Sequence, residues 1–184
     1  MTTERPILFS GPLVRAILDG RKTETRRVAR KITGPCPYGE SGDRLWVRET
    51  FLVDDVHHLT GPLPKTRPDA AVYFRANGEC CDEIPECQCK MEGARVPWRP
   101  SIHMPRWASR ISLEVTWSGV ERLQDMDDAA AIREGIEPGN IGRATPKAAF
   151  QILWDSIYDK RGFGWEMNPF VWVVRFELER VRCG

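Results

Sequence analysis

Hydrophobic and polar positions alternate with a period of two in parts of the chain, a pattern typical of β-strands. In residues 111–117 every second residue is apolar and the residues between are polar, which predicts a half-buried antiparallel strand. Residues 45–51 alternate in a similar way after a Ser-Gly-Asp turn. A continuous apolar face from Phe170 to Leu178 predicts a central strand.

Three other stretches repeat apolar residues at helical spacing. The first begins behind Ser10 and Pro12 and ends at Gly20. The second covers residues 127–134, and the third starts at a Thr-Pro capping pair and covers residues 145–157. Strands separated by scattered helices, without regular strand-helix alternation or internal repeats, indicate an α+β fold. We expect a small, partly open β-barrel with flanking helices.

The chain has 184 residues, of which 41% are hydrophobic. This length suits one domain, residues 1–184, with a core of its own. No run approaches the roughly twenty apolar residues of a membrane span, and the polar residues 1–6 do not resemble a signal peptide. We therefore expect a cytoplasmic protein without a membrane partner. Phosphate loops, dinucleotide fingerprints, nucleophile elbows and His-Glu-x-x-His metal motifs are missing from the sequence.

Basic charge is concentrated in one segment, although the net charge of the whole chain is only +1. Residues 21–31 hold six lysines and arginines against a single acid, Glu24. The segment follows Gly20, which suits the left-handed backbone that ends a helix, so we expect it to form a loop of fixed direction. Because such a cluster attracts phosphate oxygens, nucleic acid or a nucleotide is the expected partner.

Four residues at the start of this segment, Gly20, Lys22, Thr25 and Arg27, stand in the order Gly-x-Lys-x-x-Thr-x-Arg. This order resembles the Gly-x-Lys-x-x-Glu-x-Arg signature of the ASCH domains, a branch of the PUA-like RNA-associated superfamily. The sequence looks most like the ASCH proteins that phages and prophages carry. It continues through three further segments, residues 41–49, 101–110 and 131–136.

The resemblance implies a PUA-like fold with a mixed or antiparallel β-barrel, and RNA or a modified nucleoside as the partner. Thr25 stands where the family has Glu. The small bacterial acetylcytidine amidohydrolases share this departure and combine Lys, Thr and a distant Glu. The resemblance therefore implies hydrolysis of the amide of an acylated cytidine, with Lys22, Thr25 and Glu134 as catalytic residues and no cofactor required.

The chemistry of these three residue types fits that reaction. Burial would lower the pKa of Lys22, so that its neutral amine takes the proton of the Thr25 hydroxyl as it attacks a carbonyl carbon. Glu134 would then protonate the leaving amine and help to activate water. The residues also fit a non-catalytic protein, in which Lys22 contacts phosphate, Thr25 caps a turn and Glu134 is a solvated acid. An RNA-binding module and a ribonuclease in the same cleft are therefore alternatives.

Arginines and one tryptophan are the candidates for substrate binding. A guanidinium offers paired donors to phosphate, and Arg27 would orient the substrate. The Trp107 ring would stack on a base while neighbouring arginines approach phosphate. The competing interpretations are surface solubility for the arginines and core packing for the tryptophan. The assigned residues are Gly20, Arg26, Arg27, Arg106, Trp107 and Arg110.

Residues 52–100 read as a loop insertion rich in Pro, Gly and Cys. Four thiols lie within ten residues, and a structural zinc ion would supply stability that this stretch cannot gain from apolar packing. Their spacing differs from paired Cys-x-x-Cys motifs, so free thiols are the alternative. Because the adjacent Cys80 and Cys81 rarely both bind one ion, Cys36 or His103 would complete the set of four ligands. The four candidate zinc ligands are Cys80, Cys81, Cys87 and Cys89.

Overall fold

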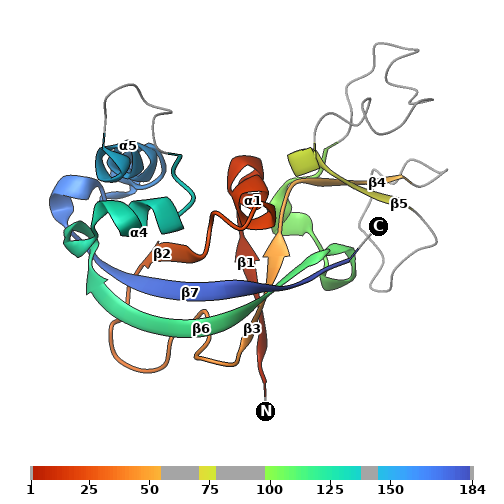
Figure 1. Cartoon of the computed structure of the whole chain (residues 1–184), viewed down its shortest axis with the longest axis horizontal. Coiled ribbons are helices and arrows are strands. Elements are labelled where there is room, and N and C mark those ends of the chain that lie inside the picture. The colour runs from red at the N-terminus through yellow and green to blue at the C-terminus, as the bar shows by residue number, and fades with distance from the viewer. Residues whose placement is uncertain (1, 55–70, 78–97, 138–144, 183–184) are drawn as a thin grey trace, which may run out of the picture.

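The computed structural model describes residues 2–54, 71–77, 98–137 and 145–182, and its main feature is a five-stranded sheet (Figure 1). The strand order is β1-β3-β6-β7-β2. β1 pairs with β3 in parallel and the other pairs are antiparallel, so the predicted α+β class with a mixed, mainly antiparallel sheet is confirmed. The five strands are β1 (Glu4–Leu8), β2 (Glu24–Val28), β3 (Arg44–Arg48), β6 (Ile111–Arg122) and β7 (Phe170–Val181).

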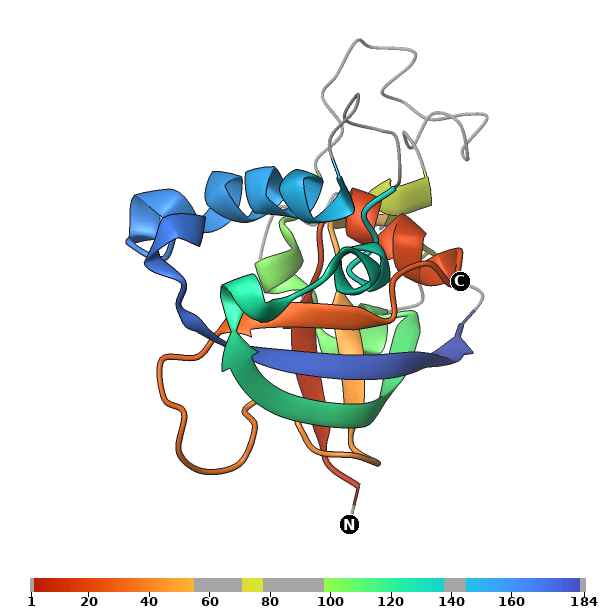
Figure 2. The ribbon, with the colours of Figure 1, turned by 60° about the vertical axis from the view of Figure 1, so that its left-hand side comes forward.

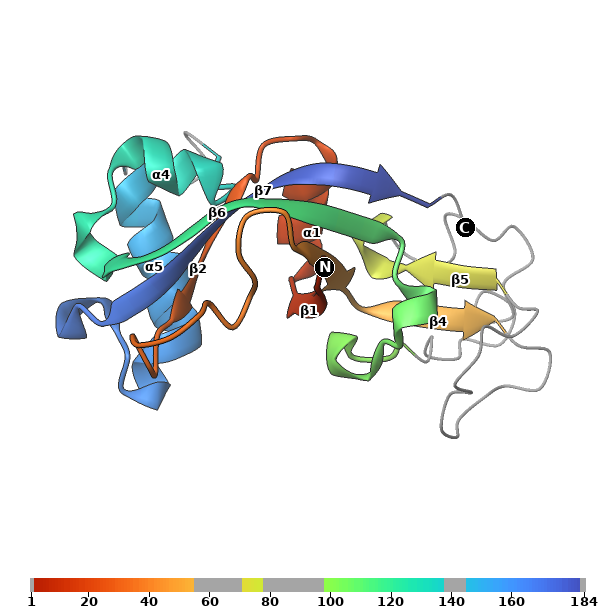
Figure 3. The same ribbon diagram turned by 90° about the horizontal axis from the view of Figure 1, so that it is seen from below.

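The sheet is strongly curved but does not close into a barrel among the described residues, because its edge strands β1 and β2 are not paired with each other. β6 and β7 have 12 residues each, and their pairing contains two register shifts. Such irregularities increase local bend and twist. Figures 2 and 3 show the two strands arching across the rest of the sheet.

Two short strands, β4 (Phe51–Asp54) and β5 (Ala71–Phe74), form a separate antiparallel pair. They belong to the part of the chain predicted to be a loop insertion, so this part begins with regular structure. The four cysteines proposed as zinc ligands lie outside the described residues. Within the described ranges, no helix is both long and apolar enough to cross a bilayer.

The α-helices of the described residues lie where their sequence signals predict, α1 at Gly11–Leu18, α4 at Asp128–Arg133 and α5 at Pro146–Tyr158. Side chains cap the N-termini of α4 and α5. The Asp127 side chain accepts a hydrogen bond from the backbone N–H of Ala130, and the Thr145 side chain accepts one from that of Ala148. Figure 1 shows α4 and α5 together at one end of the sheet, with α1 beside them. The 3-10 helices are Arg75–Asn77, Ser101–His103, Arg106–Ala108, Leu123–Asp125, Asp159–Arg161 and Trp165–Met167.

β7 lies between β6 and β2, and both of its faces are buried over residues 171–174, which confirms the predicted central position. Val174 and Phe176 belong to the main core, in which α1 packs with β1, β3 and β6. Val171 and Val173 point to the opposite face, where α4 and α5 form a second core. A strand covered on both faces reads as a continuous apolar run, as residues 170–174 do.

β2 lies at the edge of the sheet, next to β7, and this position decides where the basic segment points. Residues 24–28 were expected in a loop, and that prediction is wrong because pairing with β7 holds them in a strand. Alternate side chains of a strand point to opposite faces. Thr25 and Arg27 therefore face the main core, whereas Glu24 and Arg26 face α4. The partners on β7 of residues 24 to 27 are Arg175, Val174, Val173 and Trp172.

Gly135 lets the end of α4 approach α1 and Lys22. Its φ is +92°, and a Cβ atom there would lie 3.0 Å from Ala16 Cβ and 3.1 Å from Lys22 Cβ. Gly162 is a matched control, because its φ is +77° but nothing lies within 4 Å of a Cβ added there.

We predict that Gly135→Ala destabilises the fold more than Gly162→Ala does. Left-handed backbone costs both variants about 1–2 kcal/mol, and overpacking adds about 1–3 kcal/mol at Gly135 alone. Denaturant unfolding measures both differences. Equal loss of stability in the two variants would contradict the close approach at Gly135.

Candidate functional site

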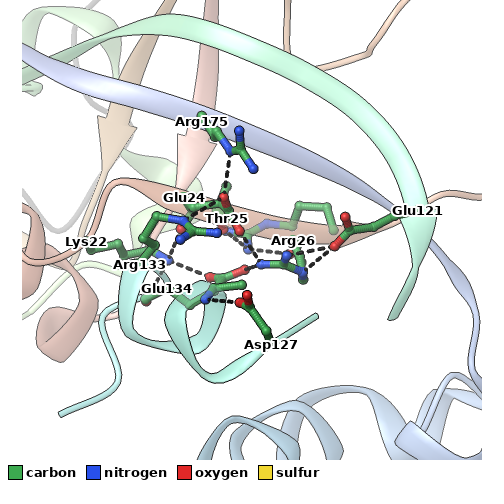
Figure 4. A network of polar contacts seen from close by, with 11 residues as sticks. Lys22, Glu24, Thr25, Arg26, Glu121, Asp127, Arg133, Glu134 and Arg175 are labelled. Atoms are coloured by element: carbon green, nitrogen blue, oxygen red, sulfur yellow. Dashed lines mark hydrogen bonds and ion pairs between the residues drawn. The ribbon is translucent and has the colours of Figure 1, made fainter. Parts of the chain in front are cut away.

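Lys22 lies buried between the edge of β2 and the C-terminal end of α4 (Figure 4). Its Nζ donates hydrogen bonds to the carbonyl oxygen of Glu24 at 2.7 Å and to that of Glu134 at 2.8 Å. A third bond reaches Glu134 Oε2 at 2.6 Å. Burial lowers the pKa of the Lys22 ammonium, and the ion pair with Glu134 offsets only part of this effect. The lysine is thus held in a site that favours loss of its proton.

Glu134 comes to Lys22 from 112 residues further along the chain. It occupies the C-cap of α4 and is 5% exposed, which excludes the alternative of a solvated acid. Its Oε1 is buried and has no hydrogen-bond partner among the described residues. Arg26 Nη1 is 3.5 Å from this oxygen, an ion-pair distance that is too long for a strong hydrogen bond. One carboxylate oxygen of Glu134 therefore has a nearby cation but no hydrogen bond among the described residues.

Thr25 is fully buried, and the alternation of β2 turns its side chain to the main-core face of the strand. Its Oγ1 accepts a hydrogen bond from Arg27 Nη1 at 2.8 Å. All three protons of the Lys22 ammonium are used elsewhere, so none bonds to Thr25 in this arrangement. The cations of Lys22 and Arg27 lie over the same Phe9 ring, 5.4 and 5.2 Å from its centroid. Of the three predicted catalytic residues, Lys22 and Glu134 are in direct contact, whereas Thr25 bonds to Arg27 and has no hydrogen bond to either of them among the described residues.

Glu24 is the buried acid beside the site that the sequence did not single out. Its side chain is fully buried and binds three arginines: Oε1 accepts from Arg26, and Oε2 accepts from Arg133 at 3.1 Å and Arg175 at 2.8 Å. Burial alone would raise the pKa of Glu24, but hydrogen bonds and charge from Arg175 and Arg26 outweigh it, so the pKa is lowered. Its position as the single acid of a basic segment was the available signal.

Arg26 belongs to this network and not to an open binding surface. Its side chain is only 3% exposed, and its guanidinium also donates to Glu121 Oε1 at 2.7 and 3.0 Å. Arg27, the next residue, points to the opposite face of β2 and lines a cleft. The alternation of the strand therefore separates two arginines that the sequence places together.

The cleft has a volume of about 470 Å³ and opens on the Arg27 side of β2. Basic side chains from the segment after β2 and from the end of α5 surround it, and aromatic rings form much of its wall. No acidic residue lines it among the described residues. Apart from Arg27, none of its lining residues was assigned to the site from sequence. The basic and aromatic lining residues are Arg27, Arg30, Lys31, Arg161, Tyr38, Tyr158, Phe163 and Trp172.

The other predicted binding residues lie elsewhere, near β4 and a third apolar cluster. Arg110 donates to the buried carboxylate of Glu49 at 3.0 and 3.1 Å. Arg106 forms a bidentate ion pair with Glu4, and Trp107 packs against the third apolar cluster. These residues do not line the cleft.

Gly20 ends α1 with a φ of +72°, as its type predicts. Cys36, considered as a zinc ligand, is buried in the main core, where burial raises the pKa of its thiol. His103 is exposed at the end of a 3-10 helix. Among the described residues, no group of three or more His, Cys, Asp or Glu side chains is arranged to hold a metal ion.

Comparison with known proteins gives two solved structures with a similar course of the chain. One is a protein of Enterococcus faecalis V583 with the family model DUF984, at 8% identity and a TM-score of 0.49, covering 100% of this chain and 84% of that one. The other is an ASCH domain of Lactobacillus crispatus JV V101, at 9% identity and a TM-score of 0.48, covering 96% and 79%. No family model and no curated protein matches the chain. Values this low assign no function.

We predict that Glu24→Gln destabilises the protein at neutral pH by about 1.5–3 kcal/mol, because a neutral amide weakens the charge-assisted hydrogen bonds to the arginines of the network while Glu121 still pairs with Arg26. The lowered pKa of Glu24 stabilises the fold above the pKa of the unfolded chain, and this contribution is lost as the pH falls through the folded-state value. Denaturant unfolding of both proteins at neutral and acid pH should show the difference narrowing in acid. Glu177→Gln, at an exposed site on β7, is the control. A difference that stays constant or widens in acid would contradict the network.

Proposed function

We propose that this protein binds RNA or a modified nucleoside and hydrolyses the amide of an acylated cytidine. The observation that carries the proposal is the buried pair of Lys22 and Glu134, in which Glu134 Oε1 makes no hydrogen bond among the described residues. The motif resemblance to the acetylcytidine amidohydrolases suggests the substrate class.

The reaction begins with a proton shift inside the buried pair. At 2.6 Å, the Lys22 proton can pass to Glu134, which converts two buried charges into a neutral amine and a neutral acid. The amine then takes the proton of the Thr25 hydroxyl as the oxygen attacks the acyl carbon. Glu134 gives its proton to the exocyclic nitrogen of cytidine as the carbon–nitrogen bond breaks. Water then cleaves the acyl-threonine ester and releases a carboxylic acid.

Arg27 controls access to the nucleophile in this scheme. Its guanidinium covers Thr25 and also donates to the carbonyl oxygen of Leu8 at 2.9 Å. Because Thr25 has no exposed surface, the side chain of Arg27 has to turn towards the cleft when substrate enters. A guanidinium moved in this way stays within reach of the acyl oxygen, on which negative charge develops.

We predict that the protein converts 4-acetylcytidine to cytidine and that Lys22→Ala and Glu134→Gln each lower kcat by about 100-fold or more, as expected for loss of a general base or acid. Chromatography of cytidine release measures the rate. Lys160→Ala, which removes an exposed lysine outside the cleft, should keep full activity. The catalytic proposal fails if Lys22→Ala leaves the deacylation rate of a folded preparation unchanged.

RNA binding without catalysis is the second candidate. Two observations favour it, since both suit a structural role. The Lys22 ammonium already donates three hydrogen bonds, and Arg27 occupies the Thr25 hydroxyl. This candidate predicts salt-dependent affinity for single-stranded RNA and no turnover of acylated nucleosides. Arg27→Gln should then weaken RNA binding. Unchanged affinity of this folded variant would exclude Arg27 as a contact.

A further inference from the structure

Three cations around the cleft have no acidic partner. Arg30, Lys31 and Arg161 are exposed, and no carboxylate lies within 4 Å of any of them among the described residues. Elsewhere in the described part of the chain arginines are commonly neutralised, as Arg26 is by Glu24 and Arg110 by Glu49. Unneutralised charge concentrated around one concavity produces a positive potential that attracts anions.

The wall beside these cations is aromatic and firmly held. The Tyr158 ring packs on Trp154 with the centroids 4.2 Å apart, and the indole of Trp154 donates to the carbonyl oxygen of Phe163 at 2.8 Å. Arg161 lies over the outer part of this wall, 5.9 Å from the Tyr158 centroid. Burial raises the pKa of Tyr38 on the other side of the cleft. Aromatic rings next to arginines are the combination that holds a base and its phosphate.

The cleft is also directly connected to the proposed nucleophile. Arg27 lines the cleft and donates to Thr25 Oγ1, so a ligand that displaces Arg27 reaches the hydroxyl from this side. At about 470 Å³ the cleft is within the usual size range of small-molecule sites. The three cations belong to the segment after β2 and the turn after α5, away from the buried Lys22.

We infer that Arg30, Lys31 and Arg161 bind a phosphate group attached to the nucleoside, so that the substrate is a nucleotide of an RNA strand and not a free nucleoside. This inference rests on the proposed function for the identity of the base, and it adds the phosphate. The aromatic wall holds the base, the three cations hold the phosphate at the mouth, and the acyl group points to Thr25.

Calorimetric titration with cytidine, cytidine 5′-monophosphate and a short single-stranded oligocytidine RNA tests this inference without any need for turnover. We predict that the monophosphate binds at least about 10-fold more tightly than cytidine, and the RNA more tightly still, because each added phosphate releases bound counterions. The double variant Arg30→Gln/Arg161→Gln should weaken both phosphate ligands about 10-fold or more and reduce the salt slope by about 1 for each lost contact. Its affinity for cytidine should not change.

Lys160→Gln is the matched control, because it removes an exposed cation next to Arg161 that does not line the cleft. Equal affinities for cytidine and its monophosphate, no binding of the monophosphate, or the same loss in the control would overturn the inference. Phosphate-dependent binding without deacylation would refute only the proposed reaction. The phosphate site alone would be refuted if the protein and the double variant deacylated free 4-acetylcytidine equally well and the monophosphate bound no more tightly than cytidine.

Discussion

The buried ion pair between Lys22 and Glu134 is the interaction on which the rest of the site depends. It joins the edge strand β2 to the end of α4, and Gly135 permits the close approach that the pair requires. Burying two charges is costly unless they are paired and hydrogen bonded, and Lys22 meets this condition with three acceptors. Glu134 meets it with one oxygen only. The proton transfer that we propose rests on this asymmetry between the two partners.

The edge position of β2 gives the basic segment two separate roles. On one face, Glu24 gathers Arg26, Arg133 and Arg175 into a network that neutralises buried charge and fixes α4 against the sheet. On the other face, Arg27 remains directed to the cleft. The network therefore supports the site from the side that a ligand does not reach.

The elements that the sequence predicts correctly are those with local signals. Caps, helical periodicity and strand alternation locate α1, α4, α5, β6 and β7, since each depends on neighbouring residues. β2 has no apolar alternation and becomes a strand only through its pairing with β7, about 150 residues away. The helix α4 could be predicted, and with it the position of Glu134 at its end, but its burial against Lys22 could not. The cleft is assembled from three distant segments, so no single stretch of sequence indicates it.

The most direct test of this account is an NMR titration of the side-chain ammonium of Lys22, assigned with a Lys22→Arg variant. Burial should give Lys22 a pKa below the ordinary value of a lysine side chain, and Glu134→Gln should lower it further, because the carboxylate partly offsets the effect of burial. A Lys22 pKa at the ordinary lysine value that does not respond to Glu134→Gln would contradict the account.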